Sequence, residues 1–210
     1  FGRCITMLEL ADRTGHASGE ERLEIESERA DALANAGRGP EAAAVFLSLA
    51  ALDPTGAHGH ERRAAEQLLF SGHLTEGLDV LGRVLGRVGL GLPTSRLASV
   101  ARVVWAQALG PGRRVMRGDL GTGPPNPALF ARVDACRTAT LGLTMTDPLA
   151  SAVMQTRHLA GALEARDPER LARALGIHMV HTAGGWYDPE RTQRIGERVD
   201  ELLRGDPAPQ

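Results

Sequence analysis

The sequence predicts an all-α fold, an α-solenoid in which antiparallel helix pairs stack into a superhelix. Apolar residues recur at helical spacing along the chain, and no segment alternates like a strand. Hydrophobic residues make up 42% of the chain but aromatic residues only 3%. The abundant alanine, leucine and glycine suit helices that pack closely together. Two segments also repeat one pattern at an offset of 35 residues, which is typical of helical repeat proteins.

The repeat lies in the first predicted domain, residues 1–109. Each copy has the pattern of a helix, a turn at glycine and a second helix. Pro54 and Pro93 stand near the ends of the second helices, where a helix stops readily. The equivalent residues of the two copies are Ala30 and Ala65, Leu33 and Leu68, Gly37 and Gly72, Glu41 and Glu76, and Phe46 and Leu81.

A further helix is expected over residues 95–109, followed by an interruption. Residues 110–127 are dense in glycine and proline and are predicted to be a loop or linker between two helical domains. The apolar residues expected on one side of the helix before this linker are Leu97, Val100, Val104 and Ala108.

The third predicted segment, residues 128–210, continues the helical array. Three of its helices are predicted to begin at an Asp-Pro pair, because aspartate accepts hydrogen bonds from the first turn and proline has no N–H to leave unsatisfied there. These pairs are Asp147-Pro148, Asp167-Pro168 and Asp188-Pro189. The whole chain is expected to hold about nine helices.

The composition excludes several functional classes. All 24 Lys+Arg residues are arginine, so the chain contains neither a complete P-loop nor a complete protein kinase, and it cannot form a lysine Schiff base. The net charge of −2 argues against a nucleic-acid partner. The sequence contains no run of about 18 apolar residues, so no membrane span is expected.

The two cysteines and the first residues favour a cytoplasmic protein. Cys4 and Cys136 have no CxxC spacing and are expected to be reduced, apolar packing residues, with no metal or other cofactor. The chain opens on Phe1 and lacks the layout of a signal peptide, so a fragment of a larger cytoplasmic protein is expected.

Gly37, Ala42, Phe46 and Pro54 follow one another at a spacing that resembles the tetratricopeptide repeat, although the tryptophan and tyrosine positions of that repeat are not matched. Residues 61–93 and 134–175 are similar to the helical tail of large bacterial serine/threonine protein kinases that carry an ATPase module between kinase and repeats. This resemblance implies a non-catalytic regulatory role. The implied partner is a protein or peptide, including the upstream kinase or ATPase domains of the same chain. Similar tails occur in bacterial transcription regulators, so that alternative stays open.

By resemblance to tetratricopeptide grooves, the binding surface is the concave face made by the first helix of each repeat. A mixed-charge surface of this kind suits a peptide segment or a neighbouring domain. The alternative is that these positions are merely solvated. The residues predicted to be exposed there are Glu24, Ser27 and Asp31 in the first copy and Arg62, Glu66 and Leu69 in the second.

Three histidines support a competing hypothesis, a metal-dependent hydrolase. His178 and His181 lie three residues apart on a predicted helix, and His158 lies one helix earlier. Two imidazoles on one face bind zinc only if a third ligand converges on them, and the chain has no HExxH motif. Packed or solvent-facing histidines are therefore the favoured interpretation, with no catalytic residue and no metal site.

Overall fold

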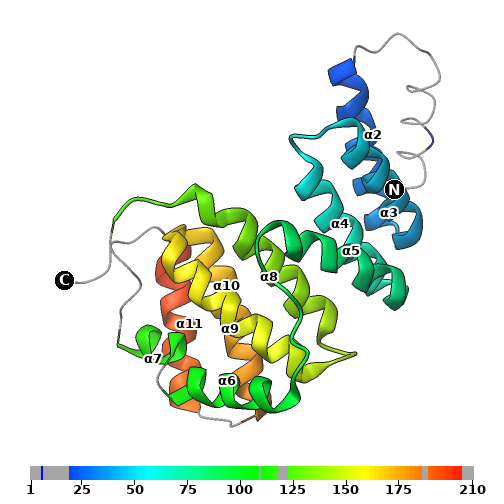
Figure 1. The fold of residues 1–210 in the computed structure, drawn as a ribbon. Helices are drawn as coiled ribbons and strands as arrows, with labels where there is room; N and C mark the ends of the chain where they lie inside the picture. Colours follow the sequence, from blue (N-terminus) through cyan, green and yellow to red (C-terminus); the bar gives the residue numbers. More distant parts are fainter. Residues whose placement is uncertain (1–5, 7–18, 109, 118–122, 186–188, 205–210) are drawn as a thin grey trace. The chain divides into compact units, whose positions relative to one another are not determined.

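The protein was examined as a computed structural model (Figure 1). The structure describes residue 6 and residues 19–108, 110–117, 123–185 and 189–204. Within these residues the regular structure is helical throughout and contains no strand, so the predicted all-α fold is confirmed. The helices form two compact units, Phe1–Gly91 and Leu92–Gln210. None of the described helices is both long enough and apolar enough to span a bilayer.

The first unit contains four described helices, each packed on the one before it (Figure 1). The predicted 35-residue repeat is confirmed by the burial of equivalent residues. Ala30 and Ala65 are completely buried, as are Phe46 and Leu81. The small alanines let the paired helices approach closely, and the larger residues fill the space behind them. The helices are α2 (Gly19–Asn35), α3 (Gly39–Leu52), α4 (Ala57–Phe70) and α5 (Leu74–Arg87).

Both repeats turn at glycine in the same way. Gly37 and Gly72 have φ angles of 75° and 85°, a left-handed conformation that disfavours residues with a Cβ atom. The amide of Arg38 donates to the carbonyl of Leu33 at 3.0 Å, and the amide of His73 donates to that of Leu68 at 2.9 Å. These bonds close each helix with a Schellman motif, so the glycine of each repeat sets where the second helix of the pair begins.

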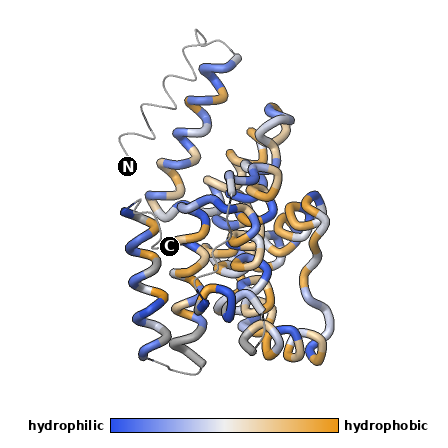
Figure 2. The backbone as a smooth tube through the Cα atoms, turned by 90° about the vertical axis from the view of Figure 1, so that its left-hand side faces the viewer, coloured by the Kyte–Doolittle hydropathy of each residue, from blue (hydrophilic) through white to orange (hydrophobic). Residues whose placement is uncertain are grey.

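The second unit contains six described α-helices and one short 3₁₀ helix. Helices α8 to α11 pack in succession, while α6 packs on α9, and α7 packs on both α9 and α11. Figure 2 shows polar and apolar residues interleaved along the helices, as expected where one side of each helix is buried. The elements are α6 (Arg96–Ala108), α7 (Pro111–Met116), η1 (Pro127–Leu129), α8 (Phe130–Leu143), α9 (Pro148–Ala165), α10 (Pro168–Gly185) and α11 (Pro189–Arg204).

Two of the three predicted Asp-Pro helix starts are confirmed in full. The Asp147 carboxylate accepts a hydrogen bond from the Ala150 amide at 3.0 Å, and Asp167 accepts one from the Arg170 amide at 2.9 Å. The third start is confirmed for the proline, since α11 begins at Pro189. Asp188 lies outside the described residues, as does Cys4.

The division of the chain differs from the one predicted from the sequence. The predicted linker, residues 110–127, contains the helix α7 and the first residue of η1. The boundary along the chain lies between Gly91 and Leu92 instead, because α6 packs against α9 and so belongs with the second unit. The described residues hold ten α-helices where about nine were expected.

Candidate functional site

The predicted concave-face residues lie on α2 and α4, and most of their charges are paired. Asp31 forms an ion pair with Arg63, and Arg62 donates to Glu66 at 3.1 Å along the same helix. Glu24 is exposed, and Ser27 is half-buried. The structure therefore uses these charges to connect or stabilise helices, and it brings Asp31 together with Arg63, which the sequence did not predict to be its partner.

The prediction that Leu69 is exposed on this face is wrong. It is buried beneath α5, at the point where Gly77 has no side chain. A Cβ atom at position 77 would lie 2.8 Å from Leu69 Cγ, so the glycine permits the close approach of α4 and α5 that encloses the leucine. Leu69 is a core residue.

The three histidines are at least partly buried among the helices. His181 lies 3.2 Å from Ser151 Oγ through Nε2 and 3.1 Å from the carbonyl of Ile177 through Nδ1. His158 and His178 are buried. In the described part of the chain, no three histidine, cysteine, aspartate or glutamate residues gather in a group that could hold a metal ion. The structure thus gives the hydrolase hypothesis no ligand set among these residues.

His158 is held in its neutral form by its surroundings. Burial lowers its pKa to about 4, and the positive charge of Arg137 adds to this effect, while Asp134 partly opposes it. Cys136 shows the same effect of a dry interior, because burial raises the pKa of its thiol to about 11. Cys136 is thus buried and uncharged, as an apolar packing residue should be.

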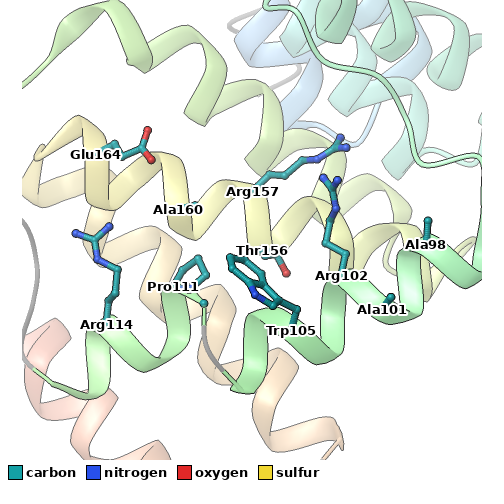
Figure 3. Close-up of a pocket in the computed structure, with 11 residues that line it drawn as sticks. Ala98, Ala101, Arg102, Trp105, Pro111, Arg114, Thr156, Arg157, Ala160 and Glu164 are labelled. Atoms are coloured by element: carbon teal, nitrogen blue, oxygen red, sulfur yellow. The ribbon is translucent and has the colours of Figure 1, made fainter.

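A surface hollow that the sequence did not predict lies within the second unit, between α6, α7 and α9. Its volume is about 750 Å³ (Figure 3). The Trp105 ring lies in the middle of it, between Thr156 of α9 and Pro111 at the start of α7. Ala98, Ala101 and Ala160 also line the hollow, and their short side chains leave the space open.

Three arginines line this hollow, and Glu164 is the single carboxylate among the lining residues that the structure describes. Figure 3 shows the guanidinium groups of Arg102 and Arg157 close together at one end, with Arg114 and Glu164 towards the other. Partial burial lowers the pKa of Arg157, and the nearby positive charge of Arg102 lowers it further. Arg132 of α8 contributes in the same direction. Two positively charged side chains therefore lie at the Arg102 end of the hollow.

An exposed apolar stripe on α6 runs beside the hollow. Leu97 is 86% exposed, Val100 49%, Val104 61% and Trp105 56%. These include three of the residues predicted to share one side of this helix; the side chain of Ala108 is not described. A stripe of this kind ordinarily faces the core. Here α6 instead buries the small residues Ser99 and Ala106, and the bulky apolar side chains point outward.

The sequence contains one signal that favours this surface. Helix α6 has two opposite sides of unequal size, one with small residues such as Ser99 and Ala106 and one with large residues such as Leu97 and Val104. Helices pack most closely through small residues. The sequence therefore also allows the small side to be buried. Burial of the small side leaves the large side exposed.

Comparison with family models, with curated proteins and with solved structures finds no match to this chain. The resemblance to kinase–ATPase tails and to tetratricopeptide repeats therefore stays a prediction from the sequence.

Proposed function

We propose that this chain is a non-catalytic protein-interaction module and that its contact surface is the α6–α9 surface. This name denotes the exposed stripe of Leu97, Val100, Val104 and Trp105 together with the hollow beside it. The observation that carries the proposal is the stripe itself, four large apolar side chains left in water on one helix. Contiguous apolar surface of this kind marks sites of protein association.

The residue types around the stripe also favour a protein partner. Tryptophan and arginine are enriched where proteins bind one another, and aromatic anchors that enter a pocket supply much of the binding energy. Trp105 is both half-exposed and part of the wall of the hollow. A side chain of a partner could therefore pack on the ring while the rest of the partner covers the stripe.

The wider context of the proposal comes from the resemblance of residues 61–93 and 134–175. On that basis the chain is a regulatory segment of a multidomain bacterial serine/threonine kinase–ATPase signalling protein, active in the cytoplasm. Its partner is a protein or peptide, including other domains of the same protein, and not nucleic acid or membrane. The tail of a transcription regulator is the alternative parent. Sequencing the reading frame upstream of Phe1 tests this context: a kinase domain followed by an ATPase supports it, and a DNA-binding domain supports the alternative.

The binding role is tested by selecting peptides from a display library of random 16-residue sequences on the full chain. We expect the selected peptides to lose binding when Leu97→Ser, Val104→Ser and Trp105→Ser are combined. The matched control combines Leu52→Ser and Phe70→Ser, which replace exposed apolar residues of the first unit. Peptides that bind the two variants equally well would contradict the proposal. Circular dichroism and thermal melting check that both variants remain folded.

A further inference from the structure

We infer that the α6–α9 surface binds an acidic amphipathic helix of a partner protein, whose aliphatic residues cover the α6 stripe and whose carboxylates pair with Arg102 and Arg157. This inference rests on the proposed function, since it names the chemistry of the partner that the same surface binds. Three features of the surface support it: the length of the stripe, the openness of the hollow and the sign of the charge beside the stripe.

The length of the stripe fits a helical partner. Leu97, Val100 and Val104 are spaced three and four residues apart, so they form one row along about two turns of α6. A helix that lies along this row presents its own apolar residues at the same spacing, which is the pattern of helix-in-groove recognition. Such a partner needs two or three aliphatic residues on one side.

The openness of the hollow favours a protein segment over a small molecule. Small-molecule sites enclose most of the ligand surface. Trp105 is more than half exposed, and the stripe continues beyond the hollow to Leu97, which is almost fully exposed. A small ligand in the hollow would leave most of the stripe uncovered, whereas a helix can cover the stripe and insert one side chain beside Trp105.

The charge beside the stripe selects an acidic partner. Arg102 and Arg157 direct their guanidinium groups to the same end of the hollow (Figure 3). Like charges held this close repel one another, and the repulsion is stronger where the groups are partly shielded from water. A carboxylate placed between them replaces repulsion with charge-assisted, bidentate hydrogen bonds, for which guanidinium groups are well shaped. A neutral or basic helix gains nothing comparable.

The sequences recovered from the display selection test the inference directly. We expect peptides enriched on the full chain to combine aliphatic residues at helical spacing with Asp or Glu on one flank. A synthetic copy of one such peptide should bind at least tenfold more weakly after its Asp and Glu residues are changed to Asn and Gln. Its affinity should also fall as salt is added, because the contact is an ion pair.

Variants of the chain provide the reciprocal test. Arg102→Glu combined with Arg157→Glu should lower the affinity for the acidic peptide at least tenfold. A peptide whose Asp and Glu residues are changed to lysine should bind this variant better than it binds the wild-type chain. The matched control is Arg173→Glu with Arg194→Glu, which makes the same change in net charge at exposed positions of α10 and α11. The control should leave the affinity unchanged.

Each outcome separates the inference from the proposed function. Peptides that need Leu97 and Trp105 but show no acidic preference would overturn the inference and leave the interaction module intact. Peptides that bind elsewhere on the chain, or a selection that enriches nothing, would overturn both. Equal weakening by the Arg102–Arg157 variant and by its control would show that only net charge matters and would also overturn the inference.

Discussion

The arginines of the first unit and those of the α6–α9 hollow differ in what surrounds them. In the first unit, arginines face carboxylates, and Arg63 also lies over the Phe46 ring with its guanidinium carbon 4.3 Å from the ring centre. At the hollow, the guanidinium groups of Arg102 and Arg157 lie close together, and Arg157 also donates to Met154 Sδ at 3.4 Å. The same residue type thus pairs with carboxylates in one region and lies beside a second arginine in the other. The pairs among the described residues of the first unit include Arg29–Glu26, Arg38–Glu41, Arg62–Glu66, Arg63–Asp31 and Arg87–Glu61.

Arg170 makes the contrast sharper because it belongs to the same unit as the hollow. Its guanidinium group donates to Asp134 at 3.1 and 3.0 Å and lies 3.9 Å from the centre of the Phe130 ring. Partial burial lowers the pKa of Arg170, but its hydrogen bonds and charge contacts with Asp134 outweigh that effect and raise it. For Arg157, burial and the neighbouring arginines act in the same direction. The pKa values of these two arginines are therefore shifted in opposite directions.

The largest expected effect concerns His158, which follows Arg157 on α9 but points into the core. The folded chain protonates His158 only near pH 4, whereas the unfolded chain does so near the usual pKa of 6.5. Stability from this group is therefore complete above about pH 6.5 and is lost as the pH falls towards 4, by about 3 kcal/mol in total. Urea unfolding across this range should show a flatter pH dependence for His158→Met than for the wild type. If the free energy of unfolding depended on pH equally in the variant and the wild type, His158 would not be a buried neutral imidazole.

The next effect tests whether paired and gathered arginines differ in stability. Arg170→Met removes the guanidinium group that pairs with Asp134 and Asp167 and should lower the free energy of unfolding by about 2 kcal/mol. Arg157→Met, the comparison variant, removes the 3.4 Å contact with Met154 Sδ and should lower the free energy of unfolding by less, about 1 kcal/mol. Denaturant titrations of both variants measure the two values. Equal losses would show that the two arginines have the same structural role.

A smaller effect is expected from relieving the like charge at the hollow. Arg102→Glu places a carboxylate near Arg157 and should stabilise the unliganded chain by about 0.5 kcal/mol, a typical value for an exposed ion pair. The gain should shrink in high salt, because screening weakens both the original repulsion and the new attraction. A loss of stability at low salt would mean that the two guanidinium groups do not repel one another in the folded chain.

The smallest effect concerns the concave face predicted from the repeats. Asp31→Arg combined with Arg62→Glu should leave the affinity for the selected acidic peptides within about twofold of wild type, because the two changes cancel in net charge and replace no residue of the α6–α9 surface. Isothermal titration measures this affinity. A clear loss would return the binding surface to α2 and α4, where Glu24, Ser27 and Glu66 also lie.

The regular part of the fold could be predicted from the sequence because local chemistry determines it. Gly37 and Gly72 mark turns that need a left-handed backbone, and Asp147-Pro148 combines a side-chain acceptor with a residue that lacks an N–H. These signals act within a few residues. They remain valid whichever helix packs next to them.

The candidate site could not be predicted because it depends on contacts between distant segments. The apolar residues of α6 have the right spacing for burial, yet α6 buries the small residues Ser99 and Ala106 instead, and the local pattern alone does not decide between the two sides. Leu69 shows the converse, since its burial follows from Gly77 on the next helix. A short helix such as α7 is also hidden by its glycine and proline content.

The most direct test measures the fluorescence of Trp105 while a peptide binds the α6–α9 surface. In the Trp186→Phe variant, Trp105 is the single tryptophan, and its fluorescence reports only on the α6–α9 surface. Acrylamide quenching is measured before and after saturation with a selected acidic peptide. The account predicts that the bound peptide shifts the emission to shorter wavelength and reduces quenching, and that Arg102→Glu with Arg157→Glu removes both changes. If acrylamide quenched Trp105 as strongly in the saturated complex as in the free chain, the proposed binding surface would be wrong.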